Sequence, residues 1–118
     1  CIIGDLSFFY DQNALWPALN GNLKVLLLNN HSGGIFNTLE GLEDSETCRQ
    51  LVKAQHQLSA ECACRQYGLT YLSAHNANEL KAGLMAFLDR SNQQPVVFEV
   101  FTDSDADTAA WQNYHRQT

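Results

Sequence analysis

The residues of this chain that could carry chemistry lie at the ends of two apolar runs. Cys1–Ile3 leads through one glycine into Asp5, and Leu23–Leu28 leads into Asn29 and Asn30. If these runs form parallel strands that end side by side, the Asp5 carboxylate and the Asn30 amide oxygen lie at one edge of a sheet. Both are hard oxygen ligands of the kind that Mg²⁺ takes while it also binds a diphosphate. The sequence therefore predicts a metal and diphosphate site at this edge.

The residues around these two ligands suit a cation that carries phosphate. Gly4 has no Cβ, so the backbone there can turn sharply and approach a ligand closely. Ser7 is expected to open a helix whose first N–H groups receive phosphate oxygens. The loop that follows Asn30 could supply a third ligand, and we predict that this ligand is the backbone carbonyl of Ser32. One carboxylate is enough in such a site, because the diphosphate neutralises the cation as well.

The extended pattern resembles a known family. Asp5 and Asn30 resemble the Gly-Asp-Gly…Asn-Asn motif of thiamine-diphosphate enzymes, with Leu6 where that motif has its second Gly. The stretches at 4–15 (GDLSFFYDQNAL) and 27–36 (LLNN, two further residues, GGIF) are similar to one branch. That branch is 2-succinyl-5-enolpyruvyl-6-hydroxy-3-cyclohexene-1-carboxylate (SEPHCHC) synthase, an enzyme of menaquinone biosynthesis.

The resemblance continues through 71–73 and 98–101, so it covers nearly the whole chain. It implies that residues 1–118 are the C-terminal portion of the thiamine-diphosphate (diphosphate-binding) domain, a three-layer α/β/α fold with a parallel sheet. In that fold the chain would hold the last four of six strands, would lack the N-terminal strands, and would leave Cys1–Ile3 as a sheet edge. Exposed edges invite pairing with another chain. We therefore expect the fragment to associate in concentrated solution.

The resemblance also implies a reaction and its cofactors. The family joins 2-oxoglutarate, with decarboxylation, to isochorismate, and uses thiamine diphosphate and Mg²⁺ (or Mn²⁺). A cytoplasmic homo-oligomer, a dimer or a tetramer, is implied for the full-length enzyme. The glutamate that activates the aminopyrimidine is expected outside this chain, and none of the four arginines lies in a recognisable motif for dicarboxylic substrates. The fragment is therefore predicted to be inactive by itself.

The resemblance implies roles for nine residues. Asp5, Asn30 and the carbonyl of Ser32 would hold the metal ion, and Leu6 and Ser7 would donate hydrogen bonds to phosphate. Ile35 and Phe36 would form an apolar wall beside the thiazolium ring and the substrate. The whole predicted cofactor site comprises Gly4, Asp5, Leu6, Ser7, Asn30, Ser32, Gly33, Ile35 and Phe36.

Two other functions fit parts of the pattern. One is another thiamine-diphosphate-dependent 2-oxo-acid decarboxylase or an acetolactate-synthase-like enzyme. Leu6 and the pair Ile35 and Phe36 argue against it. The other is a non-catalytic doubly wound binding module, which would have no Mg²⁺-dependent affinity for thiamine diphosphate.

Charge and composition narrow the class of partner. The net charge of −6 and the pI near 4.9 argue against a surface for nucleic acid or for an anionic membrane. No apolar stretch approaches the length that spans a bilayer. The four cysteines lack the spacing of a metal site and are expected to be reduced thiols.

Turn and capping signals divide the chain into alternating strands and helices, which is typical of a parallel, doubly wound sheet. Ser59 and Gly68 are expected to cap one helix, and Asn76 with Glu79 to begin the next. Ser104 with Asp107 suggests the start of the last helix. The expected helices are 7–19, 46–55, 60–67, 76–89 and 104–114, and Pro17 is a possible kink or early stop of the first one. The expected strands are 1–3, 23–28, 70–73 and 96–101, and 40–44 is expected to be a loop.

Overall fold

The computed structural model describes residues 1–17, 19–42 and 45–116 of the chain. The chain divides into two compact units. The first comprises Cys1–Asn29 and Ser59–Phe101, and the second comprises Asn30–Leu58 and Thr102–Thr118. The first unit contains every strand that the structure describes, whereas the second contains short helical segments and one longer helix.

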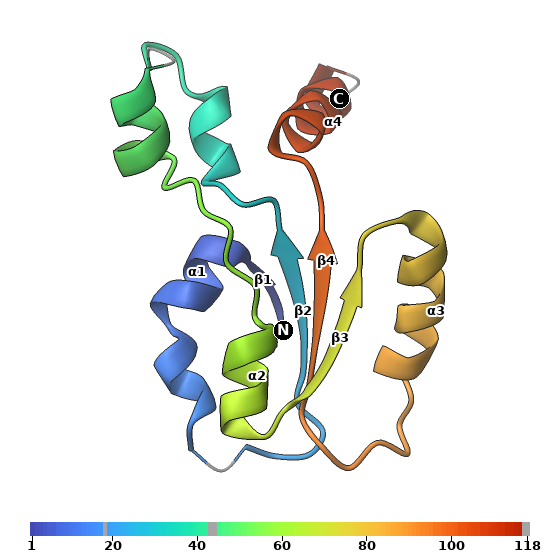
Figure 1. The fold of residues 1–118 in the computed structure, drawn as a ribbon. Coiled ribbons are helices and arrows are strands. Elements are labelled where there is room, and N and C mark those ends of the chain that lie inside the picture. Colours follow the sequence, from blue (N-terminus) through green and yellow to red (C-terminus); the bar gives the residue numbers. More distant parts are fainter. Residues whose placement is uncertain (18, 43–44, 117–118) are drawn as a thin grey trace. The chain divides into compact units, whose positions relative to one another are not determined.

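Four parallel strands form the centre of the first unit (Figure 1). They are β1 (Ile2–Gly4), β2 (Lys24–Asn29), β3 (Thr70–Ala74) and β4 (Val96–Phe101). Their order in the sheet is β1-β2-β4-β3, and each neighbouring pair is parallel. The predicted α/β class and parallel sheet are confirmed, and the strand bounds agree with the sequence prediction to within one residue at each end.

Helices cover both faces of this sheet (Figure 1). One face carries α1 (Asp5–Tyr10), the 3-10 helix η1 (Gln12–Leu15) and α2 (Glu61–Tyr67), and the other carries α3 (Ala77–Phe87). Successive side chains of a strand point to opposite faces, so β2, β3 and β4 each contribute side chains to both cores. The core under α1 and α2 contains Phe8, Leu15, Val25, Leu27, Cys64 and Val97, and the core under α3 contains Ala74, Phe87, Val96, Phe98 and Val100. The three predicted layers are therefore present.

The first helix is shorter than predicted and starts earlier. It begins at Asp5 instead of residue 7, because Gly4 caps it in an extended conformation with φ −83° and ψ 161°. The helix gives way to η1 at Asp11, whose N–H is shared between the carbonyls of Ser7 at 3.2 Å and Phe8 at 3.3 Å. A shared bond of this kind marks the change from α-helical to 3-10 geometry. Residue 18, near the predicted end, lies outside the described residues.

Of the capping residues predicted for α2 and α3, Gly68 and Asn76 are confirmed, whereas the N-cap of α2 is Ala60 and Ser59 lies one residue before it. Ser59 Oγ accepts a hydrogen bond from the Glu61 N–H at 3.2 Å, and Gly68 ends α2 in the left-handed region with φ 71°. Asn76 Oδ1 accepts from the N–H groups of residues 78 and 79 at 3.1 and 3.0 Å. The Glu79 carboxylate accepts from the N–H of residue 75, and this bond lowers the pKa of Glu79. Helix α3 ends at Phe87, two residues earlier than expected.

The second unit contains the 3-10 helix η2 (Gly34–Thr38), the π-helix η3 (Cys48–Val52) and α4 (Ser104–Arg116). The short helix expected within 46–55 is therefore present, as a π-helix. Of the loop expected at 40–44, residues 43 and 44 lie outside the described part. The last helix begins where predicted, but its cap is Asp103, whose Oδ1 accepts from the N–H groups of residues 105 and 106 at 3.1 and 2.9 Å.

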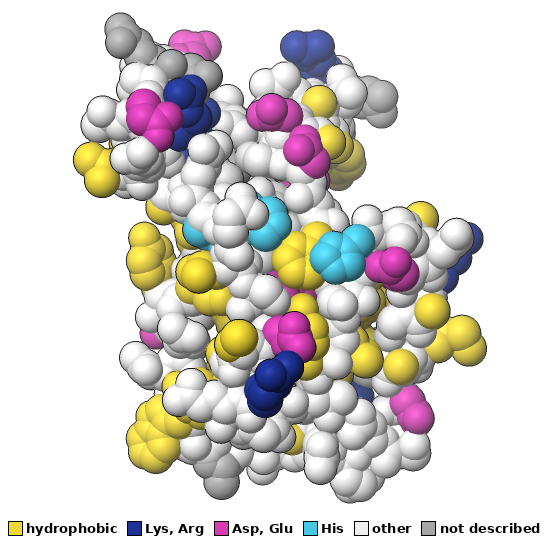
Figure 2. All heavy atoms as spheres, viewed as in Figure 1, with side chains coloured by type: hydrophobic (Ala, Val, Ile, Leu, Met, Phe, Trp, Pro, Cys, Tyr) yellow, Lys and Arg dark blue, Asp and Glu magenta, His cyan; other side chains and the backbone are white. Residues whose placement is uncertain are grey.

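Apolar side chains stand among polar ones on the face drawn in Figure 2. In the first unit, Ile2 on β1 is 74% exposed, and Met85 on α3 is 80% exposed. Scattered exposed apolar side chains are ordinary on folded proteins. None of the helices in the described ranges combines the length and the hydropathy that a bilayer crossing requires.

Candidate functional site

The register of the sheet places the ends of β1 and β2 side by side, so that the two predicted motifs follow neighbouring strands at the same edge of the sheet. Gly4, the last residue of β1, pairs with Leu28, the penultimate residue of β2. Asp5 follows Gly4 as the first residue of α1, and its side chain is only 4% exposed. Asn29 ends β2 and Asn30 follows it as the first residue of the second unit. The predicted parallel neighbours are confirmed, and the shared coordination of a metal ion by Asp5 and Asn30 stays a prediction.

The first turn of α1 holds the Asp5 carboxylate through its own backbone. The Leu6 N–H donates to Asp5 Oδ1 at 2.8 Å. Ser7 is the third residue of the helix and is exposed, so it does not open the helix as predicted. A Cβ at Gly4 would meet nothing within 4 Å, and the φ of Gly4 is one that any residue adopts. What the glycine provides is therefore open space beside Asp5 and not a special backbone conformation.

The Asn30 amide is held at both ends within the second unit. Its Oδ1 accepts from the Ser32 N–H at 3.2 Å, and its Nδ2 donates to Asp107 Oδ2 at 3.3 Å. Asp107 also accepts from Thr102 Oγ1 at 2.6 Å. A Cβ at Gly34 would lie 2.9 Å from the Asn30 nitrogen, so only glycine fits there without a shift. Sequence reasoning assigned Asp107 to the start of a helix and missed this contact with a candidate ligand.

The loop after Asn30 turns at His31, which has a φ of 61°. Ser32 is not among the residues with positive φ, so a serine is compatible with this position. Ser32 is 4% exposed, and its hydroxyl and the Gly33 N–H both donate to the Lys53 carbonyl, at 3.5 and 2.6 Å. The loop that holds two candidate ligands is therefore fastened to the segment around Lys53.

A polar cavity of about 310 Å³ lies in the second unit, and Asn30 and Ser32 are among the residues that line it. Arg49 and Lys53 line it as well, so two cationic side chains stand around the same space as two candidate ligands. Ile35, in η2, is 70% exposed and Phe36 is half-buried. Their predicted role as an apolar wall stays a prediction.

Within the described residues, no group of three or more His, Cys, Asp or Glu side chains could hold a metal ion. The predicted donor set is of another kind, because it consists of one carboxylate, one side-chain amide and one backbone carbonyl. All four cysteines are free thiols, as the sequence predicts.

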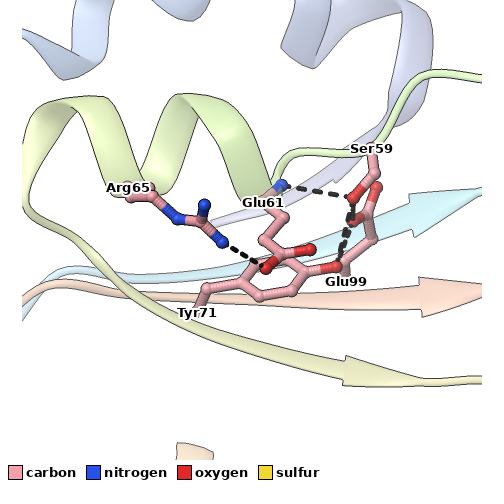
Figure 3. Close-up of polar contacts among 5 residues, drawn as sticks. All are labelled: Ser59, Glu61, Arg65, Tyr71 and Glu99. Atoms are coloured by element: carbon pink, nitrogen blue, oxygen red, sulfur yellow. Dashed lines mark hydrogen bonds and ion pairs between the residues drawn. The ribbon is translucent and has the colours of Figure 1, made fainter.

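Sequence reasoning did not single out Glu99. Its side chain is fully buried in β4 and forms hydrogen bonds with Ser59 and Tyr71, which Figure 3 shows, and with Asn29. The available signal was an acidic residue inside the otherwise apolar run Val96–Phe101, where burial requires polar partners.

Comparison with protein-family models finds no match. Similarity to curated proteins is extensive. A SEPHCHC synthase of Phocaeicola vulgatus is 40% identical over 116 residues, which is 97% of this chain and 21% of the relative. Those of Bacteroides fragilis and Flavobacterium johnsoniae are 42% identical over 118 residues and 34% identical over 117 residues, each covering 98% of this chain. The chain spans about a fifth of the length of the curated relatives that it matches.

Proposed function

Because the chain belongs to the SEPHCHC synthase family, with 40% identity across 97% of its length, we propose that the full-length protein joins 2-oxoglutarate to isochorismate with loss of carbon dioxide. Thiamine diphosphate and Mg²⁺ (or Mn²⁺) are its proposed cofactors. It would act in the cytoplasm as a homo-oligomer, either a dimer or a tetramer. The identity to named synthases along nearly the whole chain is the observation that carries this proposal.

The chemistry of the donor set fits the proposed metal ion. Asp5, Asn30 and the carbonyl of Ser32 are three hard oxygen donors with one negative charge, which suits a cation that also binds phosphate oxygens. Asp5 is nearly buried, and the position of Gly4 beside it is open. We therefore assign Asp5, Asn30 and Ser32 as the metal ligands.

Neighbouring groups would orient these ligands. Because a carboxylate can only accept hydrogen bonds, Asp107 holds the Asn30 amide with its nitrogen toward α4 and its oxygen away from it. The Leu6 N–H orients the Asp5 carboxylate in the same way. Partners of this kind beside metal ligands commonly matter for metal affinity.

The remaining assigned residues would hold the organic part of the cofactor. Ser7 would donate to the diphosphate, and the Leu6 N–H, which donates to Asp5 Oδ1 in the structure, would be shared with a phosphate oxygen. Gly33 would let the diphosphate approach the loop, and Ile35 and Phe36 would exclude water beside the reacting carbon. Bound thiamine diphosphate would supply the electron sink that decarboxylation requires. The glutamate that activates it is proposed to lie outside this chain, so the chain alone should not turn over substrate.

The test uses the full-length protein and follows the consumption of isochorismate with 2-oxoglutarate or pyruvate as the second substrate. We expect turnover with 2-oxoglutarate only, and only when Mg²⁺ and thiamine diphosphate are both present. In Asp5→Ala, Mg²⁺-dependent binding of thiamine diphosphate should weaken by on the order of a hundredfold, at least as much as the loss of a ligand's neighbour costs. Asp89→Ala removes an exposed carboxylate of the same unit and serves as the matched control.

Preference for pyruvate would favour the acetolactate-synthase-like alternative. Absence of any Mg²⁺-dependent binding of thiamine diphosphate to the wild-type protein would favour the non-catalytic module and overturn the proposal.

A further inference from the structure

The Glu99 side chain lies at the centre of the first unit, between apolar neighbours. It is 0% exposed, and Phe98 and Val100, which flank it on β4, are buried in the core on the opposite face. A buried carboxylate is costly unless hydrogen-bond donors replace the water that it loses. The identity of the donors around Glu99 indicates the role of this residue.

Four neutral groups surround this carboxylate. Asn29 Nδ2 donates to Oε1 at 2.8 Å. Ser59 Oγ and Tyr71 Oη donate to Oε2 at 2.8 and 2.6 Å (Figure 3). The Ala60 N–H lies 3.2 Å from one oxygen and 3.1 Å from the other. The donors come from the end of β2, from the approach to α2 and from β3, so one side chain ties three elements to β4.

The tyrosine stays a donor over the ordinary pH range. Burial, followed by the hydrogen bond to Glu99, raises the pKa of Tyr71 to about 12. The amide nitrogen of Asn29 and the backbone N–H of Ala60 are donors in every state. An apolar residue at position 99 would leave these buried donors without an acceptor, which costs more than the loss of an average hydrogen bond.

We propose that Glu99 is a positioning residue for the metal site, acting through Asn29. The inference rests on the proposed function, in which Asn30 binds the metal ion. Asn29 is 0% exposed, and its side chain is fixed by Glu99. Consecutive Cα atoms are about 3.8 Å apart and joined by a planar peptide bond. The orientation of Asn29 therefore sets where the chain enters Asn30.

The other donors provide an internal control. Tyr71 Oη and Ser59 Oγ both donate to Oε2 of Glu99, whereas Asn29 at the end of β2 donates to Oε1. Removing the Tyr71 hydroxyl weakens the network but leaves the bond between Asn29 and Glu99 in place. If Glu99 acted only by stabilising the fold, Tyr71→Phe and Asn29→Ala would affect the metal site alike.

The experiment measures the Mg²⁺ dependence of thiamine diphosphate binding to the full-length protein by calorimetry, together with hydrogen exchange at the Asn30 amide. Asn29→Ala and Glu99→Ala should each weaken the apparent Mg²⁺ affinity by about tenfold to a hundredfold and speed exchange at Asn30. Tyr71→Phe should lower the melting temperature and leave the affinity within about twofold of the wild type, below the range for a residue that orients a ligand. Glu99→Gln can keep an oxygen toward Asn29 and Ala60, so it should restore most of the affinity.

Each outcome either supports or overturns the positioning role of Glu99. If Asp5→Ala abolishes binding but Asn29→Ala and Glu99→Ala bind Mg²⁺ as the wild type does, the positioning role is wrong and the proposed function stands. If the wild type shows no Mg²⁺-dependent binding, the proposed function fails and this inference fails with it. Should Glu99→Ala not fold, the pair Asn29→Ala and Tyr71→Phe decides, because equal effects of the two on Mg²⁺ affinity would overturn the proposal.

Discussion

In the first unit, buried apolar side chains on both faces of a sheet hold the elements together, whereas in the second unit polar side chains bridge the segments. Leu27, Val96 and Phe98 are fully buried in the first unit. In the second, Asn30 and Asn37 reach the side chains of α4, and Leu51 and Trp111 are 77% and 57% exposed. Apolar burial stabilises more per side chain than such hydrogen bonds do. We therefore expect the second unit to open at lower free energy than the first.

The largest effect should come from the core of the first unit. Phe98→Ala removes a fully buried ring that packs against Gly83 and Phe87. The free energy of unfolding, measured by chemical denaturation, should fall by about 3–5 kcal/mol. Met85→Ala, at an exposed position of α3, should change it by less than about 0.5 kcal/mol. Similar losses for the two variants would contradict the described core.

A pair of glycines compares the two units directly. Gly68 in the first unit and Gly41 in the second have φ of 71° and 86°, and a Cβ at either would meet nothing within 4 Å. Alanine is strained at such φ by roughly 1 kcal/mol. Gly68→Ala should lower the denaturation midpoint of the sheet, whereas Gly41→Ala should leave it unchanged if the second unit opens first. Equal shifts would show that the two units unfold together.

A smaller and more local effect is expected at Asn37. Its Nδ2 donates to Ser104 Oγ and Thr108 Oγ1, both at 3.0 Å, and so links η2 to the first turns of α4. Asn37→Ala should reduce the hydrogen-exchange protection of this part of α4 by about 1 kcal/mol. Asn113→Ala changes an exposed asparagine of the same helix and should not reduce it. Unchanged protection in Asn37→Ala would mean that the polar bridge does not hold the helix.

The last prediction concerns the stability of the fold at alkaline pH, and no change in stability is expected near neutral pH. Burial, followed by the charge of Glu99, raises the pKa of Cys64 from 9.0 to about 12, and the pKa of Tyr71 rises from 10.0 to about 12. The folded state therefore keeps protons that the unfolded state releases, and stability falls as the pH rises from about 9 toward 12.

Denaturation midpoints measured between these pH values should fall less steeply in Cys64→Ala and Tyr71→Phe than in the wild type. The slopes are compared, because both variants also change packing or hydrogen bonding at every pH. A slope equal to that of the wild type would contradict the raised pKa values.

Elements with strong local signals could be predicted from the sequence. The apolar run before Asn29 forms a strand, Gly68 ends a helix and Asn76 begins one, because each of these depends on residues a few positions apart. The early end of the first helix could not be predicted. The helix changes to 3-10 geometry at Asp11, well before the possible stop at Pro17, and Leu15 of η1 then packs into the core.

The candidate site likewise contains some features that the sequence could predict and others that it could not. The pairing of Gly4 with Leu28 follows from two parallel strands and was predictable. The contact between Asn30 and Asp107 joins residues far apart in the sequence, and no local sequence pattern indicates it. The partners of Glu99 are similarly dispersed, although an acidic residue within an apolar strand could have signalled that partners exist.

The network around Glu99 also affects how the chain can vary in length. Asn29 and Ser59 flank residues 30–58, and both bind the same carboxylate. The two ends of this intervening stretch are therefore held together at Glu99 of β4. Closing a longer loop costs little extra, about 0.6 kcal/mol for each doubling of its length. Insertions and deletions near residue 41 should therefore leave the sheet intact, because both ends of the stretch stay anchored at Glu99.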